Sequence, residues 1–280
     1  SWKGAGVAIP VFSLKSENSL GVGEFSDIKL LTDWAAGAGI KMIQLLPVND
    51  TSSKFDRTDS YPYNAISAFA LHPIYINLAA IEGVDVFTEL KSIYKKGKEL
   101  NALPALDYES VIKIKTEGLR KLYALLGNKC FETEAFKKFL DKNRSWLVPY
   151  AVFCYLRDEN ATTDFRIWKT YSTYVAKEID VLSNLQDVAF YYFVQYHLHL
   201  QLKSAIAYAH QKGVVLKGDI PIGISRNSCD AWVDPELYNF HWQAGAPPGG
   251  FATGGQNWGF PIYNWGQMQK DGYAWWKERL

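Results

Sequence analysis

Two short apolar runs separated by one amphipathic segment constrain the fold of this chain more than any other feature. Residues 6–14 (GVAIPVFSL) and 41–48 (KMIQLLPV) have the length and composition of buried strands. Between them, apolar residues recur with the period of a helix and predict one buried face: Ile28, Leu31, Trp34 and Ala35. A strand, a helix and a strand within about 45 residues form a βαβ unit, so we expect an α/β fold with a parallel sheet covered by helices.

The same pattern returns near residue 186, after a long helical and lysine-rich stretch. An apolar stripe from Phe190 to Ala209 predicts a helix that Gly213 ends, and residues 214–217 predict a third strand. Between residues 91 and 144, thirteen Lys or Arg stand against seven Asp or Glu. A basic patch for a partner and a set of solvated helix faces both fit this excess, and the second is the commoner outcome.

The chain therefore divides into three predicted parts. Residues 1–83 carry the first strands and helix, residues 84–185 form an inserted helical subdomain, and residues 186–280 hold the third helix and strand. Within the last part, residues 225–272 are rich in Gly, Pro and aromatic rings and predict one long functional loop, followed by a helix over 273–280. Three parallel strands are too few to close a barrel.

Charge, hydrophobicity and cysteine spacing exclude several classes of protein. Thirty basic and twenty-nine acidic residues leave a net charge of +1, which gives no support for nucleic-acid binding. No apolar run reaches the roughly 18 residues that a membrane helix needs. Three widely spaced cysteines predict a reducing compartment rather than a disulfide framework, and we expect a cytoplasmic protein.

Several motifs of cofactor and metal chemistry are missing from the sequence. His197 and His199 are two residues apart in a predicted helix, so their side chains diverge by about 200° and cannot bind one metal ion together. No dinucleotide fingerprint, phosphate-binding loop or nucleophile elbow occurs. We therefore predict neither a metal nor a cofactor.

Three segments place polar and aromatic side chains after the predicted strands, where α/β folds bind ligands. They are residues 59–64 (DSYPYN), Asp219 at the end of the third strand, and residues 246–261 in the long loop. Aromatic residues make up 15% of the chain, and rings beside Asp, Asn and Gln suit an uncharged, polyhydroxylated ligand. The alternative is that these rings cap the sheet as core and that Asp219 only binds backbone amides; composition by itself favours the core.

Several segments occur in the order found in one enzyme family: residues 9–14 (IPVFSL), 19–25 (SLGVGEF), 44–50 (QLLPVND), 59–63 (DSYPY), 67–73 (SAFALHP), 218–223 (GDIPIG) and 255–265 (GQNWGFPIYNW). In these segments the chain resembles the 4-alpha-glucanotransferases, also called amylomaltases or disproportionating enzymes. The sequences YPY at 61–63 and WGFP at 258–261 are similar to the plant-cytosolic type and its bacterial relatives.

The resemblance implies a (β/α)8 TIM barrel with helical insertions, of which this chain carries the first three strands. It implies transfer of α-1,4-glucan segments between maltosaccharides by a retaining mechanism, in which one carboxylate attacks the anomeric carbon and a second carboxylic acid protonates the leaving oxygen. The family places the nucleophilic Asp, the acid Glu and a stabilising Asp in segments that we expect beyond Leu280. We therefore expect no catalytic residue in this chain and no activity from it alone.

Two further readings stay open beside this one: a non-catalytic α-glucan-binding remnant, and a starch-hydrolysing relative. Three strands with an open edge also predict either a missing barrel half or self-association.

The resemblance carries over a set of residues that bind the glucan: Asp59, Ser60, Tyr63, Asp219, Phe251, Gln256 and Trp258. Tyr63 matches the tyrosine that stacks near the reacting sugar, and Asp219 matches a carboxylate that supports the site. The chain departs from the family at Gly249 and Gly250, where the usual sequence has Asp and Tyr. The loss of a carboxylate and a ring there predicts a weaker hold on substrate by this loop.

Overall fold

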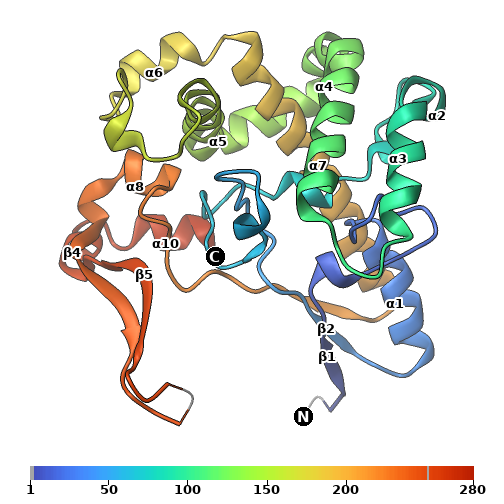
Figure 1. Cartoon of the computed structure of the whole chain (residues 1–280), viewed down its shortest axis with the longest axis horizontal. Helices are drawn as coiled ribbons and strands as arrows, with labels where there is room; N and C mark the ends of the chain where they lie inside the picture. Colours follow the sequence, from blue (N-terminus) through green and yellow to red (C-terminus); the bar gives the residue numbers. More distant parts are fainter. Residues whose placement is uncertain (1–2, 251) are drawn as a thin grey trace.

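Three short parallel strands form the sheet on which the predicted site rests. The computed structural model describes residues 3–250 and 252–280. The strands β1 (Gly6–Ala8), β2 (Met42–Gln44) and β3 (Val215–Lys217) lie in the order β1-β2-β3, and both pairs are parallel (Figure 1). The predicted α/β class with three parallel strands is therefore confirmed. The strands are shorter than the apolar runs, because Pro10 and Pro47 follow them closely and cannot donate to a ladder.

Helices account for most of the remaining regular structure. Their bounds are α1 (Asp27–Gly37), α2 (Val86–Glu89), α3 (Lys91–Asn101), α4 (Tyr108–Glu132), α5 (Glu134–Asn160), α6 (Ala176–Leu182), α7 (Gln186–Gln211), α8 (Cys229–Val233), α9 (Trp265–Lys270) and α10 (Ala274–Arg279). The predicted stripe of α7 is confirmed, since Phe190 and Ala209 are buried, and Gly213 follows the helix with φ +71°. The final helix is confirmed as α10.

The two faces of the sheet have different surroundings. Val7, Ile43 and Leu216 are in register across the three strands and join the same apolar core as α1 and α7. On the opposite face, Lys217 donates from Nζ to Gln44 Oε1 at 3.2 Å, and this bond is exposed. One face of the sheet is therefore covered by helices, and the other is open among the described residues.

The predicted apolar face of α1 is wrong at one position. Ile28, Thr32 and Ala35 are buried, whereas Trp34 has 54% of its surface exposed. At about 100° per residue, Trp34 lies about 120° from Ile28 around the helix axis, outside the stripe that the other three form. We interpreted Trp34 as a core ring, and the structure places it on the surface.

In the helical stretch from residue 84 to 185, α4 and α5 pack against α7, and α3 packs against α4. Most of its lysines are exposed, as expected for solvated helix faces. Lys115 is the exception, because it is fully buried and donates from Nζ to Glu24 Oε1 and to the Ile76 carbonyl, both at 2.7 Å. One buried cluster runs through all three predicted parts of the chain, and the division into domains stays a prediction.

The interpretation of residues 225–272 as one long loop is wrong. This segment contains α8, an antiparallel hairpin of β4 (Tyr238–Ala246) and β5 (Gln256–Tyr263), and α9. Irregular pairing between residues 239 and 245 breaks the period of two that would have revealed the strands. In Figure 1 the hairpin projects away from the helical body.

Candidate functional site

The carboxyl ends of β2 and β3 bring together two of the predicted residues. Tyr63 lies in the segment that follows β2, and Asp219 comes two residues after β3. Tyr63 Oη donates to Asp219 Oδ2 at 3.0 Å, although the two residues are 156 positions apart. The pKa of Tyr63 is raised by burial and by the neighbouring carboxylate, so the phenol stays neutral and remains a donor.

Asp219 is held at its second oxygen as well. The backbone N–H of Ile220 donates to Asp219 Oδ1 at 3.0 Å. Each carboxylate oxygen has two lone pairs, so this fixed, half-buried group can still accept hydrogen bonds from ligand hydroxyls.

A second ring lies beside Tyr63. The centroids of Tyr61 and Tyr63 are 5.6 Å apart at an interplanar angle of 48°, and Tyr61 is 55% exposed. Pro62 between them restricts the backbone, so the rings are held together at the end of the sheet. Such rings offer apolar faces while the Tyr63 hydroxyl stays bound to the carboxylate.

The carboxylate of Asp59 binds the backbone of the preceding loop and makes no hydrogen bond with Tyr63 or Asp219 in the described part of the chain. The side chain is buried, and its Oδ2 accepts from the backbone N–H groups of Ser53, Lys54 and Phe55 at 2.9, 2.8 and 2.6 Å. Burial raises the pKa of Asp59, and the three amide donors oppose that rise. Asp59 therefore shapes the loop over residues 53–55, and its contact with a sugar stays a prediction.

Ser60 is exposed and donates from Oγ to the Arg57 carbonyl at 2.8 Å. Together with Asp59 it lines a cavity of about 250 Å³ whose other walls include Tyr75 and Tyr108. The structure thus brings Ser60 next to Asp59, and no hydrogen bond among the described residues joins either side chain to Tyr63.

The hairpin carries the remaining predicted residues. On β5, Trp258 Nε1 donates to Gln256 Oε1 at 2.8 Å, which couples the two predicted side chains. Both are exposed, and Trp258 has 40% of its surface accessible. Phe251 lies outside the described residues. Gly249 and Ala252 pair across the tip of the hairpin.

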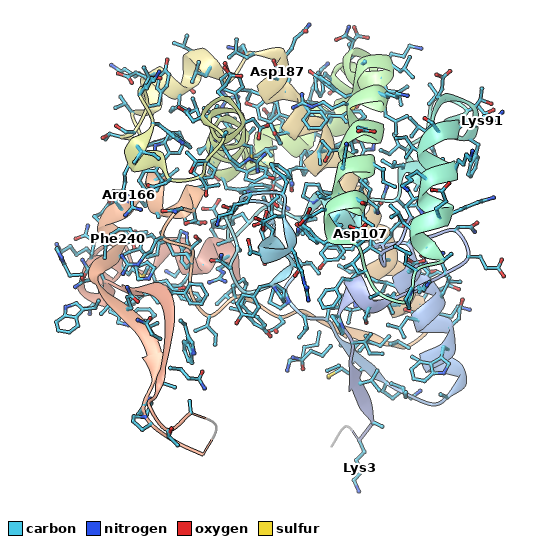
Figure 2. All side chains as sticks on the ribbon, in the orientation of Figure 1. Lys3, Lys91, Asp107, Arg166, Asp187 and Phe240 are labelled. Carbon is cyan, nitrogen blue, oxygen red and sulfur yellow. The ribbon has the colours of Figure 1, made fainter. Side chains whose placement is uncertain are left out.

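Arg226 is a residue that the sequence did not predict to matter for the hairpin and that the structure shows to hold it together. It donates from Nη1 to the Phe240 carbonyl at 2.8 Å, from Nη2 to the Trp242 carbonyl at 3.0 Å and from Nε to the Gly259 carbonyl at 3.0 Å. One side chain therefore joins both strands of the hairpin, near its base where Phe240 lies (Figure 2). A signal for it was available, because Arg226 is the only charged residue between Asp219 and Asp230.

The aromatic surplus divides between core and surface. Tyr238 and Trp275 are buried at the base of the hairpin, with ring centroids 6.1 Å apart. Tyr263 donates from Oη to the Ile222 carbonyl at 2.9 Å and so supports the segment after β3. Trp258 and Trp242 are exposed on the hairpin, the latter at 66%. Some of the aromatic rings therefore belong to the core, and others lie on the surface where they are free to contact a ligand.

Residues 3–250 and 252–280 contain no group of three or more His, Cys, Asp and Glu side chains arranged to hold a metal ion. In the same part of the chain, no helix has both the length and the apolar character required to cross a bilayer.

A parallel sheet with helices on one face, and with tyrosine and carboxylate side chains near the carboxyl ends of its strands, defines an α/β protein, and folds of this class bind their ligands at the strand ends. Comparison with known proteins identifies the family. The chain matches the 4-alpha-glucanotransferase family over residues 9–280, and it belongs to that family.

Two relatives show how far the similarity extends. The chain is 45% identical over 284 residues to 4-alpha-glucanotransferase DPE2 of Oryza sativa subsp. japonica, covering 100% of this chain and 30% of that protein. It is 36% identical to a 4-alpha-glucanotransferase of Chlamydia pneumoniae, covering 98% of this chain and 52% of that protein. The chain thus spans about half or less of the relatives' length. The family resemblance stated from the motifs is confirmed.

Solved structures confirm the fold. An amylomaltase from Streptococcus agalactiae in complex with acarbose superposes with a TM-score of 0.80 at 24% identity, covering 99% of this chain and 56% of that one. An amylomaltase from Corynebacterium glutamicum gives 0.77 at 22% identity, covering 99% and 38%. The three parallel strands are therefore part of a TIM barrel with helical insertions.

Proposed function

We propose that the protein to which these 280 residues belong transfers α-1,4-glucan segments between maltosaccharides, and that these residues supply sugar-binding side chains. The observation that carries the proposal is the bond from Tyr63 to Asp219 at the strand ends, in a chain that matches the family over residues 9–280. The acarbose complex of the Streptococcus amylomaltase supports an α-glucan-like ligand. We also propose a cytoplasmic location, which the widely spaced cysteines support.

In this proposal the described residues bind and orient the sugar. The Tyr63 ring packs against the C–H face of a glucose unit, and Asp219 accepts from its hydroxyls. Trp258 and Gln256 hold a further unit from the hairpin, and Phe251 adds an aromatic wall. Asp59 and Ser60 keep the loop before Tyr63 in shape and line the neighbouring cavity.

The chemical step needs two carboxyl groups, which we propose to lie beyond Leu280. One attacks the anomeric carbon while the other protonates the leaving oxygen, and the 4-hydroxyl of a second sugar then displaces the enzyme carboxylate. Residues 1–280 alone can therefore bind a glucan at most, and they do not transfer glucan segments.

Incubation with maltotriose tests the proposal. The full-length protein should produce glucose together with longer maltosaccharides, without a net rise in reducing ends, and residues 1–280 alone should produce neither. A steady rise in reducing ends would assign the protein to the starch hydrolases. If the full-length protein leaves maltotriose unchanged, the alternative of a non-catalytic glucan-binding remnant is favoured. Transfer by residues 1–280 alone would refute the proposal that the catalytic carboxyl groups lie outside them.

We propose that further chain or a second copy covers the open side of the sheet. Val215, Ile220 and Ile222 are 45%, 39% and 61% exposed at and just after β3, and apolar groups so placed favour association. Sedimentation velocity of residues 1–280 should show self-association, and a stable monomer at high concentration would contradict this.

A further inference from the structure

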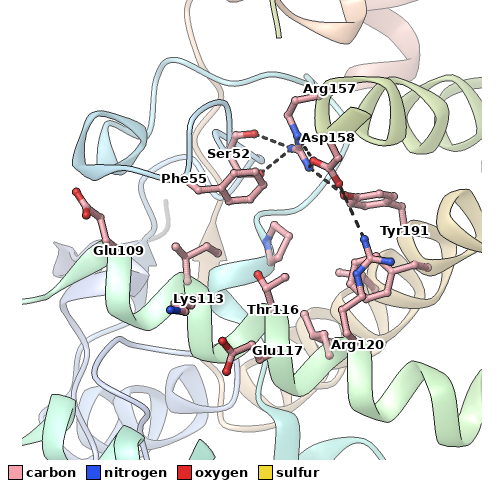
Figure 3. A pocket seen from close by; sticks show the side chains of 15 residues that line it. Ser52, Phe55, Glu109, Lys113, Thr116, Glu117, Arg120, Arg157, Asp158 and Tyr191 are labelled. Carbon is pink, nitrogen blue, oxygen red and sulfur yellow. Dashed lines mark hydrogen bonds and ion pairs between the residues drawn. The ribbon is translucent and has the colours of Figure 1, made fainter. Parts of the chain in front are cut away.

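A second cavity lies between α4, α7 and the segment after β2 (Figure 3). Its volume is about 510 Å³, within the range of small-molecule sites. Much of its wall is apolar and comes from four parts of the chain: Phe55, Pro73, Ile112, Leu119, Phe190 and Val194. None of the predicted sugar-binding residues in the described part of the chain lines it.

The charged group deepest in this wall is already satisfied. Arg157 is 3% exposed and donates from Nε to Asp158 Oδ1 at 2.9 Å and from Nη1 to the Ser52 carbonyl at 2.7 Å. Its Nη2 donates to Tyr191 Oη at 3.0 Å and forms an ion pair with Asp158 Oδ1 at 2.8 Å, and Nη1 also donates to Ser52 Oγ at 3.3 Å. The guanidinium thus makes four hydrogen bonds within the protein, and the Asp158 carboxylate balances its charge.

The second guanidinium at the cavity is paired as well. Arg120 lies 3.7 Å from the centroid of the Phe190 ring and donates from Nη1 to Asp187 Oδ1 at 3.1 Å, with Asp158 at 4.0 Å. Figure 3 shows Arg120 and Arg157 on either side of Asp158 and Tyr191. The inner wall therefore carries no net charge that would attract an ion.

One uncharged polar group at the cavity remains available to a ligand. Thr116 on α4 is half-buried and lines the cavity, and its hydroxyl has no hydrogen-bond partner among the described residues. A hydroxyl can both donate and accept, so it suits a ligand with a hydroxyl or carbonyl group. Glu109, Lys113 and Glu117 of the same helix also line the cavity, and their side chains are exposed to solvent at its rim.

The aromatic wall at Phe55 is fixed in advance. Phe55 has φ +60°, a strained conformation for a large side chain, and the bonds from residues 53–55 to the Asp59 carboxylate hold it there. Its ring lies 4.6 Å from the Arg157 guanidinium. Strained backbone that the surrounding structure over-determines is typical of ligand sites.

We propose that this cavity binds an uncharged, flat, ring-containing small molecule whose ring packs against Phe55, Phe190 and the aliphatic wall and whose hydroxyl or carbonyl group bonds Thr116. The paired charges of the inner wall disfavour both anions and cations, because a charged ligand seated there would lose its hydration without gaining a free counter-charge; the charges of Glu109, Lys113 and Glu117 lie at the exposed rim, where water screens them. The apolar wall supplies the affinity, and Thr116 supplies the orientation.

The test uses the full-length protein that contains these residues and three naphthalene probes. 2-Naphthol is neutral at pH 7, whereas 2-naphthoate and 2-naphthylmethylammonium carry opposite charges on the same ring system. Titration should show that 2-naphthol binds at least about tenfold more tightly than either charged probe. Saturating maltotriose should leave this binding unchanged, whatever the outcome of the transfer assay.

Two variants locate the site. Thr116→Trp fills the cavity and should weaken 2-naphthol binding at least about tenfold, whereas Lys121→Trp on the exposed side of α4 should not change it. Thr116→Val keeps the volume, removes only the hydroxyl and should weaken binding about fivefold, the equivalent of one hydrogen bond. Equal binding of a charged probe, competition by maltotriose, or unchanged affinity in the Thr116 variants would overturn the proposal.

Discussion

Replacing Arg226 with lysine should loosen the hairpin of β4 and β5 while the helical body stays intact. Arg226 donates three hydrogen bonds to carbonyls on both strands, at 2.8 to 3.0 Å. A lysine ammonium at this position can reach one of them, so two bonds are lost. At about 1 kcal/mol for each partly exposed bond, the hairpin loses about 2 kcal/mol, which raises the population of its open form about 30-fold.

Hydrogen exchange measures this opening directly. Amides of β4 and β5 should exchange about 30-fold faster in Arg226→Lys, and amides of α7 should be unchanged. The matched control is Arg144→Lys, since Arg144 is exposed on α5 and should not affect either region. Unchanged protection of the hairpin would refute the role of Arg226, and equally faster exchange in α7 would show a global effect instead.

Two further predictions concern buried charges. Lys115→Met leaves the Glu24 carboxylate buried without its partner at 2.7 Å, so urea unfolding should show a loss of about 3–5 kcal/mol, and adding Glu24→Leu should recover more than half of it; no loss would contradict the pairing. Burial, with repulsion from neighbouring carboxylates, raises the pKa of Asp234 to about 6. Because the pKa of Asp234 is higher in the folded state than in the unfolded state, the protonated side chain favours the folded state below about pH 4. This contribution to the free energy of unfolding is lost as the pH rises through 6 and the partly buried carboxyl group ionises. Asp234→Asn should therefore raise the unfolding free energy by about 1–2 kcal/mol at pH 8, after allowance for partial exposure, and not at pH 4; equal melting temperatures at pH 8 would contradict it.

The parts of the fold that follow from local pattern could be predicted. Periodicity over short segments predicts the βαβ unit and the apolar stripe of α7, and the positive φ that Gly213 readily adopts predicts the end of that helix. Both signals come from residues that are close together in the sequence. The motif order also predicted the family, and the positions of Tyr63 after the second strand and of Asp219 at the end of the third predicted a site at the carboxyl ends of the strands.

The parts of the fold and of the site that depend on residues far apart in the sequence could not be predicted. The hairpin of β4 and β5 has irregular pairing, so its strands show no alternation. The burial of Lys115 becomes intelligible only with Glu24, which is 91 positions away. The sequence predicts sugar binding by Asp59 from its position in the DSYPY segment. In the structure its carboxylate accepts hydrogen bonds from three backbone amides of the preceding loop.

We propose that the aromatic residues at the strand ends and on the hairpin bind an α-glucan. Calorimetric titration of the full-length protein with acarbose, which occurs in complex with the Streptococcus agalactiae amylomaltase, tests it most directly. Trp258→Ala removes a stacking ring worth roughly 1–3 kcal/mol and should weaken binding about 5- to 150-fold. The control is Trp34→Ala, an equally large exposed ring on α1, which should leave the dissociation constant unchanged. An unchanged constant in Trp258→Ala, or an equal loss in both variants, would contradict the claim.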